Sequence, residues 1–108
     1  MKSDLAARRL AELGNVTRLD IFRLLVRAGH DGLSISEVRD RLDIPMSTLA
    51  FHLRGLVQAG LVEQEKVGRT VICRGGFGAL QELVGFLQDQ CCQGLPALPA
   101  AKRKQGVA

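Results

Sequence analysis

The segment from Ser34 to Gly60 constrains the fold of this 108-residue chain more than any other part of it. It opens with Ser34-Ile35-Ser36-Glu37, which has the spacing of a capping box and predicts a short helix that ends near Leu42. Asp43-Ile44-Pro45 is typical of a tight turn, and the fixed φ angle of proline suits the start of a second helix. The second helix is predicted to stop at Gly60. The segment is therefore predicted to form helix, tight turn and helix.

Two further helices are predicted ahead of this segment. Apolar residues at helical spacing predict the first over residues 5–13, and Gly14-Asn15 ends it and offers a cap for the next. The next is predicted from Val16 to about Ala28, and apolar residues cover much of its circumference. That pattern is typical of a helix buried at the centre of a domain.

A hairpin and a last helix are predicted after the segment. The β-prone runs Leu61–Lys66 and Thr70–Arg74 are joined by Val67-Gly68-Arg69, in which glycine can supply a positive φ angle. Residues 77–93 are predicted to be helical, with Gly94 as the stop. The expected fold is thus mainly α with one β-hairpin, in the order ααα α ββ α, which is that of a winged helix-turn-helix.

The length of the chain allows one domain with a modest core. We expect residues 1–94 to form this domain and residues 95–108 to be a disordered basic tail. The chain has no apolar run near the length of a membrane span and no apolar stretch at its amino-terminus. We therefore expect a cytoplasmic protein with reduced thiols and no membrane partner.

Local charge indicates nucleic-acid binding better than net charge does. The formal net charge of +4 falls to +1 when the run 102–104 is left out, but residues 45–60 and 66–74 contain no acid. One face of the helix over 45–60 is predicted to point inward, with Leu49, Leu53, Leu56 and Val57. The opposite face suits a major groove, because small residues permit close approach and polar ones can bond phosphates or base edges. The expected contacts with double-stranded DNA are Ser47, Thr48, Phe51, His52 and Arg54 on the helix and Lys66 and Arg69 on the hairpin.

Two alternatives stay open for these residues. They could be ordinary solvated faces of a winged-helix module that binds other proteins and never touches DNA. His52 could bond a phosphate, or it could brace its helix against a neighbour. An enzyme is not expected, because the chain has no Cys-x-x-Cys, no Ser/His/Asp set and no phosphate-binding glycine loop.

Four motifs, in this order, resemble the ArsR/SmtB family of metal-responsive repressors: Leu13-Gly14-Asn15-Val16-Thr17-Arg18-Leu19, Ser47-Thr48-Leu49-Ala50-Phe51-His52-Leu53, Ala59-Gly60-Leu61-Val62 and Val67-Gly68-Arg69. The resemblance covers roughly residues 5–92. It implies a homodimer built on the first and last helices, which binds an inverted-repeat operator and leaves DNA when an inducer binds. The last helix itself has apolar residues at steps of 3, 4, 3 and 4, an a/d seam that favours packing on its own symmetry mate. These residues are Phe77, Leu80, Val84, Leu87 and Cys91.

Cys91 and Cys92 are the candidate inducer site. Neighbouring Cα atoms lie about 3.8 Å apart, so a disulfide between the two would be strained, whereas a soft thiophilic ion between the sulfurs lengthens the bridge. The resemblance to arsenic-responsive members points to trivalent arsenic as the inducer, with no permanently bound cofactor expected. Arsenite needs a third thiol, from Cys73, glutathione or a partner chain, whereas a monomethyl arsenical needs only the pair. Residues 34–42 have no cysteine and the last helix has no histidine, so other metal sites of the family are missing.

The cysteines also have other interpretations. Cys91 and Cys92 could be small apolar packing residues, and Cys73 alternates with Val71 as a residue buried on a strand would. A repressor of the same fold could instead sense oxidants or persulfides, with Cys73 or a partner's cysteine resolving oxidised Cys91.

Overall fold

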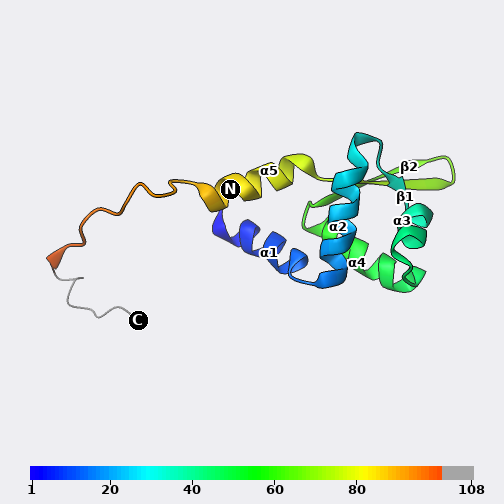
Figure 1. The fold of residues 1–108 in the computed structure, drawn as a ribbon, viewed down its shortest axis with the longest axis horizontal. Coiled ribbons are helices and arrows are strands. Elements are labelled where there is room, and N and C mark those ends of the chain that lie inside the picture. Colours follow the sequence, from blue (N-terminus) through cyan, green and yellow to red (C-terminus); the bar gives the residue numbers. More distant parts are fainter. Residues whose placement is uncertain (101–108) are drawn as a thin grey trace.

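A computed structural model describes residues 1–100, in which five α-helices and a three-stranded sheet follow one another (Figure 1). The helices are α1 (Ser3–Leu13), α2 (Val16–Ala28), α3 (Ile35–Leu42), α4 (Met46–Gln58) and α5 (Phe77–Gln88). The strands are β1 (Leu33–Ser34), β2 (Val62–Val67) and β3 (Thr70–Gly75), and a short 3-10 helix, η1 (Gly29–Asp31), follows α2. The predicted mainly helical fold with a hairpin is confirmed.

The helix-turn-helix begins at the predicted capping box. Ser34 Oγ accepts a hydrogen bond from the Glu37 N–H at 3.1 Å, and Glu37 Oε1 accepts one from the Ser34 N–H at 3.0 Å. α3 ends at Asp43, whose φ of 52° is left-handed and turns the chain toward Pro45 and α4. At the other end of α4, Gly60 has a φ of 76°, a conformation that glycine adopts without a steric penalty.

The sheet contains one strand that the sequence pattern does not predict. β2 and β3 form the expected antiparallel hairpin, and β1 pairs with the other edge of β3, with Leu33 opposite Cys73. β1 is only two residues long, so it has no alternation from which to predict it. Its close approach depends on Gly32, because a Cβ there would collide with the Cys73 carbonyl oxygen.

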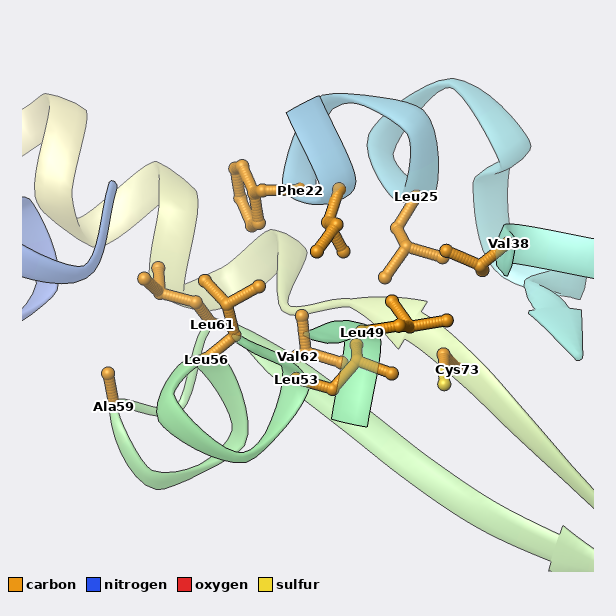
Figure 2. Close-up of a cluster of buried hydrophobic side chains, with 11 residues drawn as sticks. Phe22, Leu25, Val38, Leu49, Leu53, Leu56, Ala59, Leu61, Val62 and Cys73 are labelled. Atoms are coloured by element: carbon orange, nitrogen blue, oxygen red, sulfur yellow. The ribbon is translucent and has the colours of Figure 1, made fainter. Parts of the chain in front are cut away.

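The core lies where α2, α3 and α4 meet the sheet (Figure 2). α2 contacts α1, α3, α4 and β3, as a central helix should. It is not buried around its circumference as predicted, because only Ile21, Phe22 and Leu25 are buried and Leu19 is 39% exposed. The prediction that Val57 points inward is wrong, because its side chain is 36% exposed. The inward stripe of α4 is narrow, and Val57 lies at its edge. The fully or nearly fully buried side chains of the stripe are Leu49, Leu53 and Leu56.

α5 ends five residues earlier than the predicted end at residue 93. Its C-cap is Asp89, and both Gln90 and Cys92 have positive φ angles, of 58° and 63°. Left-handed residues cannot continue a right-handed helix, so Cys91 lies in a turn and not on the helical seam. Within the helix, Val84 and Leu87 of the seam are exposed, whereas Leu83 is buried against the rest of the chain.

The expected tail over residues 95–108 is described only in part. Residues 95–99 are exposed and belong to no helix or strand, and residues 101–108 lie outside the described residues. No helix within residues 1–100 is long and apolar enough to cross a membrane.

Candidate nucleic-acid interface and cysteine pair

α4 presents an acid-free polar face to solvent. Ser47, Phe51 and Arg54 are exposed on it, and Thr48 and His52 lie half-buried at its flanks. Pro45 caps the helix without a side-chain hydrogen bond, so the first backbone N–H groups of α4 have no capping side chain. Such N–H groups and the positive end of the helix dipole favour phosphate oxygens.

The hairpin after α4 carries positive charge at its turn. Lys66 and Arg69 are exposed near the turn between β2 and β3, and neither makes an ion pair within residues 1–100. Arg74, also on the hairpin, is occupied differently: it pairs with Glu65 at 3.1 Å and donates to the His30 carbonyl oxygen at 2.8 Å. Of these three hairpin residues, Lys66 and Arg69 therefore carry the positive charges that are available to a ligand.

His52 contacts α2, so the structure shows the bracing contact that was one of its two interpretations. An Arg18 guanidinium nitrogen lies 3.3 Å from His52 Nδ1. Arg18 Nε donates to the Glu12 carbonyl oxygen at 2.6 Å and lies 3.2 Å from the Glu12 carboxylate. Gly55 makes room for that carboxylate, because a Cβ there would stand 2.5 Å from Glu12 Oε2. Arg18 belongs to a motif of the sequence, but no sequence pattern shows that it contacts His52.

Arg9 is a second residue whose role the sequence does not reveal. It lies on α1, is 9% exposed and donates from Nε to the Ala59 carbonyl oxygen, the C-cap of α4, at 3.0 Å. Its Nη1 lies 3.9 Å from the Glu82 carboxylate on α5 and has no hydrogen-bond partner within residues 1–100. Arg9 therefore connects α1 and α5 to the end of α4.

Cys91 and Cys92 lie together in the exposed turn after α5. Their sulfur atoms are 3.2 Å apart, well beyond the disulfide bond length of about 2.05 Å, so the pair is two free thiols. The amino-terminus lies beside this end of α5 (Figure 1), where Met1, Phe86 and Asp89 line a cavity of about 310 Å³.

Cys73 lies elsewhere, in the hydrophobic core. Its side chain is fully buried on β3, and Gln64 Nε2 donates to its sulfur at 3.5 Å. The twelve residues of α5 rise about 18 Å along the helix axis, so one chain does not bring Cys73 to the pair. Within residues 1–100, no three His, Cys, Asp or Glu side chains are grouped so as to hold a metal ion.

Comparisons with known proteins agree with this architecture. A family model described as "Helix-turn-helix domain" matches residues 13–65. An ArsR-like transcriptional regulator from Rhodococcus sp. RHA1 is 32% identical with a TM-score of 0.70, over 79% of this chain and 77% of that one. Reduced HlyU from Vibrio cholerae N16961 is 30% identical with a TM-score of 0.63, over 84% of this chain and 93% of that one.

A relative found by sequence comparison is also a helix-turn-helix regulator. The uncharacterized HTH-type transcriptional regulator YbzH of Bacillus subtilis is 28% identical, with 72% of this chain and 90% of that protein aligned. The solved relative at 32% identity is an ArsR-like regulator, and the described elements follow the winged helix-turn-helix order. The chain therefore belongs to the ArsR family of winged helix-turn-helix transcriptional regulators, whose members are DNA-binding proteins and not enzymes.

Proposed function

We propose that this protein is a homodimeric repressor that binds an inverted-repeat operator in double-stranded DNA and leaves it when trivalent arsenic binds Cys91 and Cys92. A similar soft thiophilic ion would act in the same way. The observation that carries the proposal is the exposed pair of thiols with sulfurs 3.2 Å apart. The repressor would act in the cytoplasm, where thiols stay reduced.

The spacing of the thiol pair fits a single bridging atom. Metal–thiolate bonds of about 2.3 Å to one shared atom allow two sulfurs to be up to about 4.6 Å apart. A separation of 3.2 Å lies inside this limit and outside the range of a disulfide. The separation of the two sulfurs is therefore compatible with one bridging soft atom.

The third position on the arsenic atom needs a ligand from outside this chain. Cys73 is fully buried on β3, and the length of α5 separates it from the pair. Residues 93–108 contain no cysteine. Glutathione or a partner chain can supply the third sulfur, and the carbon of a monomethyl arsenical fills the position without one. Both forms of arsenic fit the pair.

The exposed seam of α5 supports the proposed dimer. Val84 and Leu87 are 43% and 58% exposed in the single chain, and a symmetry mate would cover them. A winged helix-turn-helix domain of Mycobacterium bovis with the same fold, 22% identical with a TM-score of 0.65, is described as homodimeric. Two copies of α4 would then face half-sites about one helical turn of DNA apart.

The contacts of Arg9 offer a physical route from the thiols to DNA. Coordination of both sulfurs would hold the turn after α5 in one conformation. α5 packs on α1, and Arg9 joins both helices to the last turn of α4. A shift of the two dimerisation helices would thus change the position of α4 relative to its half-site.

The experiment tests operator binding and arsenic binding separately. Duplexes selected by the protein from a random-sequence pool should contain an inverted repeat, and native mass spectrometry should find one arsenic per chain. Loss of that arsenic is expected in Cys91→Ser/Cys92→Ser, but not in the control Cys73→Ala. If no inverted repeat is enriched in the selected pool, the proposed operator is contradicted. If the arsenic adduct persists in the double variant, Cys91 and Cys92 are not the arsenic site.

Redox sensing by the same pair is the second candidate. One solved relative, HlyU from Vibrio cholerae, is described as reduced. A peroxide would oxidise Cys91 to a sulfenic acid and release water, and a partner's thiol would then condense with it and release a second water. Release from DNA by peroxide but not by arsenite would favour this candidate.

A further inference from the structure

The contact between Arg18 and His52 fixes the position of a proton on the imidazole. A guanidinium group has donors only, so Arg18 donates and His52 Nδ1 accepts across the 3.3 Å between them. An imidazole nitrogen that accepts a hydrogen bond carries no proton. In the neutral ring the proton is therefore on Nε2, and Nε2–H is a donor.

Nε2 of His52 is the imidazole nitrogen that Arg18 does not contact. No residue within 1–100 forms a hydrogen bond with Nε2. Within the same residues, the one buried side-chain nitrogen or oxygen without a hydrogen-bond partner is Arg9 Nη1, so Nε2 is not buried. Nε2 is therefore accessible to solvent at the flank of α4. The α1–α2 junction lies beside α4 here (Figure 1).

Two arginines lie near His52 on this side of α4. Arg18 and Arg54 line a cleft of about 200 Å³ together with Glu12 and Phe51, and His52 itself lies outside this lining. Glu12 offsets the charge of Arg18, but Arg54 is exposed and has no ion pair within residues 1–100. An accessible N–H and a guanidinium group without an ion pair are both donors that suit phosphate oxygens.

Arg18 is itself held firmly. Its Nε is bonded to the Glu12 carbonyl oxygen and lies next to the Glu12 carboxylate, and its side chain is 20% exposed. A long side chain with these contacts loses its rotamer freedom when the protein folds, not when DNA arrives. The donor to Nδ1 is thus in place before DNA binds.

We propose that Arg18 is a positioning residue that holds His52 as its Nε2–H tautomer, and that this N–H donates to a phosphate oxygen of the DNA backbone. The inference rests on the proposed binding of duplex DNA and adds a contact to it. Because a phosphate contact carries no base information, its loss weakens binding to all sequences alike.

Two substitutions at His52 test the roles of the two imidazole nitrogens separately. In His52→Asn the side-chain oxygen takes the place of Nδ1 and can still accept from Arg18, but the outer donor is lost. In His52→Gln the amide reaches the place of Nε2 and keeps the donor, but the bond to Arg18 is lost. Binding is measured by fluorescence anisotropy with a random-sequence duplex of about 30 base pairs, long enough for two half-sites.

The expected result is a split between affinity and stability. His52→Asn should bind about tenfold more weakly at unchanged melting temperature, and His52→Gln should keep most of the affinity with a lower melting temperature. Wild-type affinity in His52→Asn, or equal losses in both variants, overturns the phosphate contact. A wild-type chain that binds no duplex overturns the proposed function as well.

Nitrogen-15 NMR tests the tautomer without DNA. At about pH 8.5, where histidine in model peptides is neutral, His52 should be the pure Nε2–H tautomer. His30, whose ring nitrogens make no hydrogen bond within residues 1–100, is the internal control. Arg18→Met should shift His52 toward the tautomer mixture of His30. A proton on His52 Nδ1 in the wild-type protein overturns the role of Arg18.

Discussion

At the scale of single residues, burial separates the three cysteines. Burial raises the pKa of the Cys73 thiol above its usual 9.0, and the hydrogen bond from Gln64 opposes this only in part. Since the thiolate is the reactive form, Cys73 is protected by both its pKa and its position. Cys91 and Cys92 are exposed to reagents in water.

Alkylation should therefore be confined to the pair in the folded protein. With iodoacetamide near neutral pH, Cys91 and Cys92 are expected to react, and Cys73 only after urea unfolds the chain. Peptide mass spectrometry distinguishes the sites. Native Cys73 reacting as fast as the pair would contradict its place in the core.

The contacts of Arg18 and Arg9 mark the limit of prediction at this scale. The exposed face of α4 was predictable, because helical spacing alone divides Leu49 and Leu53 from the residues opposite them. Arg18 meets His52 across 34 positions, and Arg9 meets Ala59 across 50. Such pairs follow from the packing of whole helices, and no local pattern contains them.

At the scale of elements, the start of α3 depends on a carboxylate. Hydrogen bonds from the Ser34 backbone N–H and then the Ser34 hydroxyl lower the pKa of Glu37 below its usual 4.5. The folded protein thus binds this proton less tightly than the unfolded chain does. The stabilisation by the carboxylate is present above pH 4.5 and is lost as the pH falls below it.

The variant Glu37→Gln tests this dependence. Its free energy of unfolding should be lower than that of the wild type near neutral pH, and the difference should shrink between about pH 4.5 and pH 3. Urea denaturation across this range measures it. A difference that stays constant with pH would show that the carboxylate charge does not contribute.

Arg9 should contribute more to the free energy of unfolding than its neighbour Arg8 does. Arg9→Met leaves the Ala59 carbonyl oxygen without its donor and is expected to cost roughly 1–3 kcal/mol of stability. Arg8 is exposed and reaches the Gln58 carbonyl oxygen only at 3.5 Å, so Arg8→Met should cost less than about 0.5 kcal/mol. Equal losses of stability in the two variants, measured by urea denaturation, would contradict a stabilising role specific to Arg9.

The elements differ in how far sequence could predict them. The capping box, Pro45 and Gly60 are local signals, so α3 and α4 were predicted with nearly correct ends. β1 depends on pairing with β3, forty residues away, and so was missed. α5 was predicted too long because the apolar spacing continues to Cys91, although the backbone turns at Gln90.

At the scale of the whole molecule, the exposed seam of α5 makes the proposed dimer testable. Leu87→Glu places a charge in the proposed interface and should give a folded monomer with much weaker DNA binding. Leu95, which is 96% exposed and outside the helices, supplies the control Leu95→Glu, which should remain dimeric. Light scattering after size-exclusion chromatography measures both. A dimeric Leu87→Glu variant would contradict an interface on α5.

The most direct test of the account is the release of operator DNA. Anisotropy of a labelled operator is measured with wild-type protein and with Cys91→Ser/Cys92→Ser, each with and without arsenite and glutathione. Arsenite is expected to weaken binding by the wild type at least tenfold, a coupling of about 1.4 kcal/mol, and to leave the double variant bound. Equal release of both proteins, or release of neither, would contradict it.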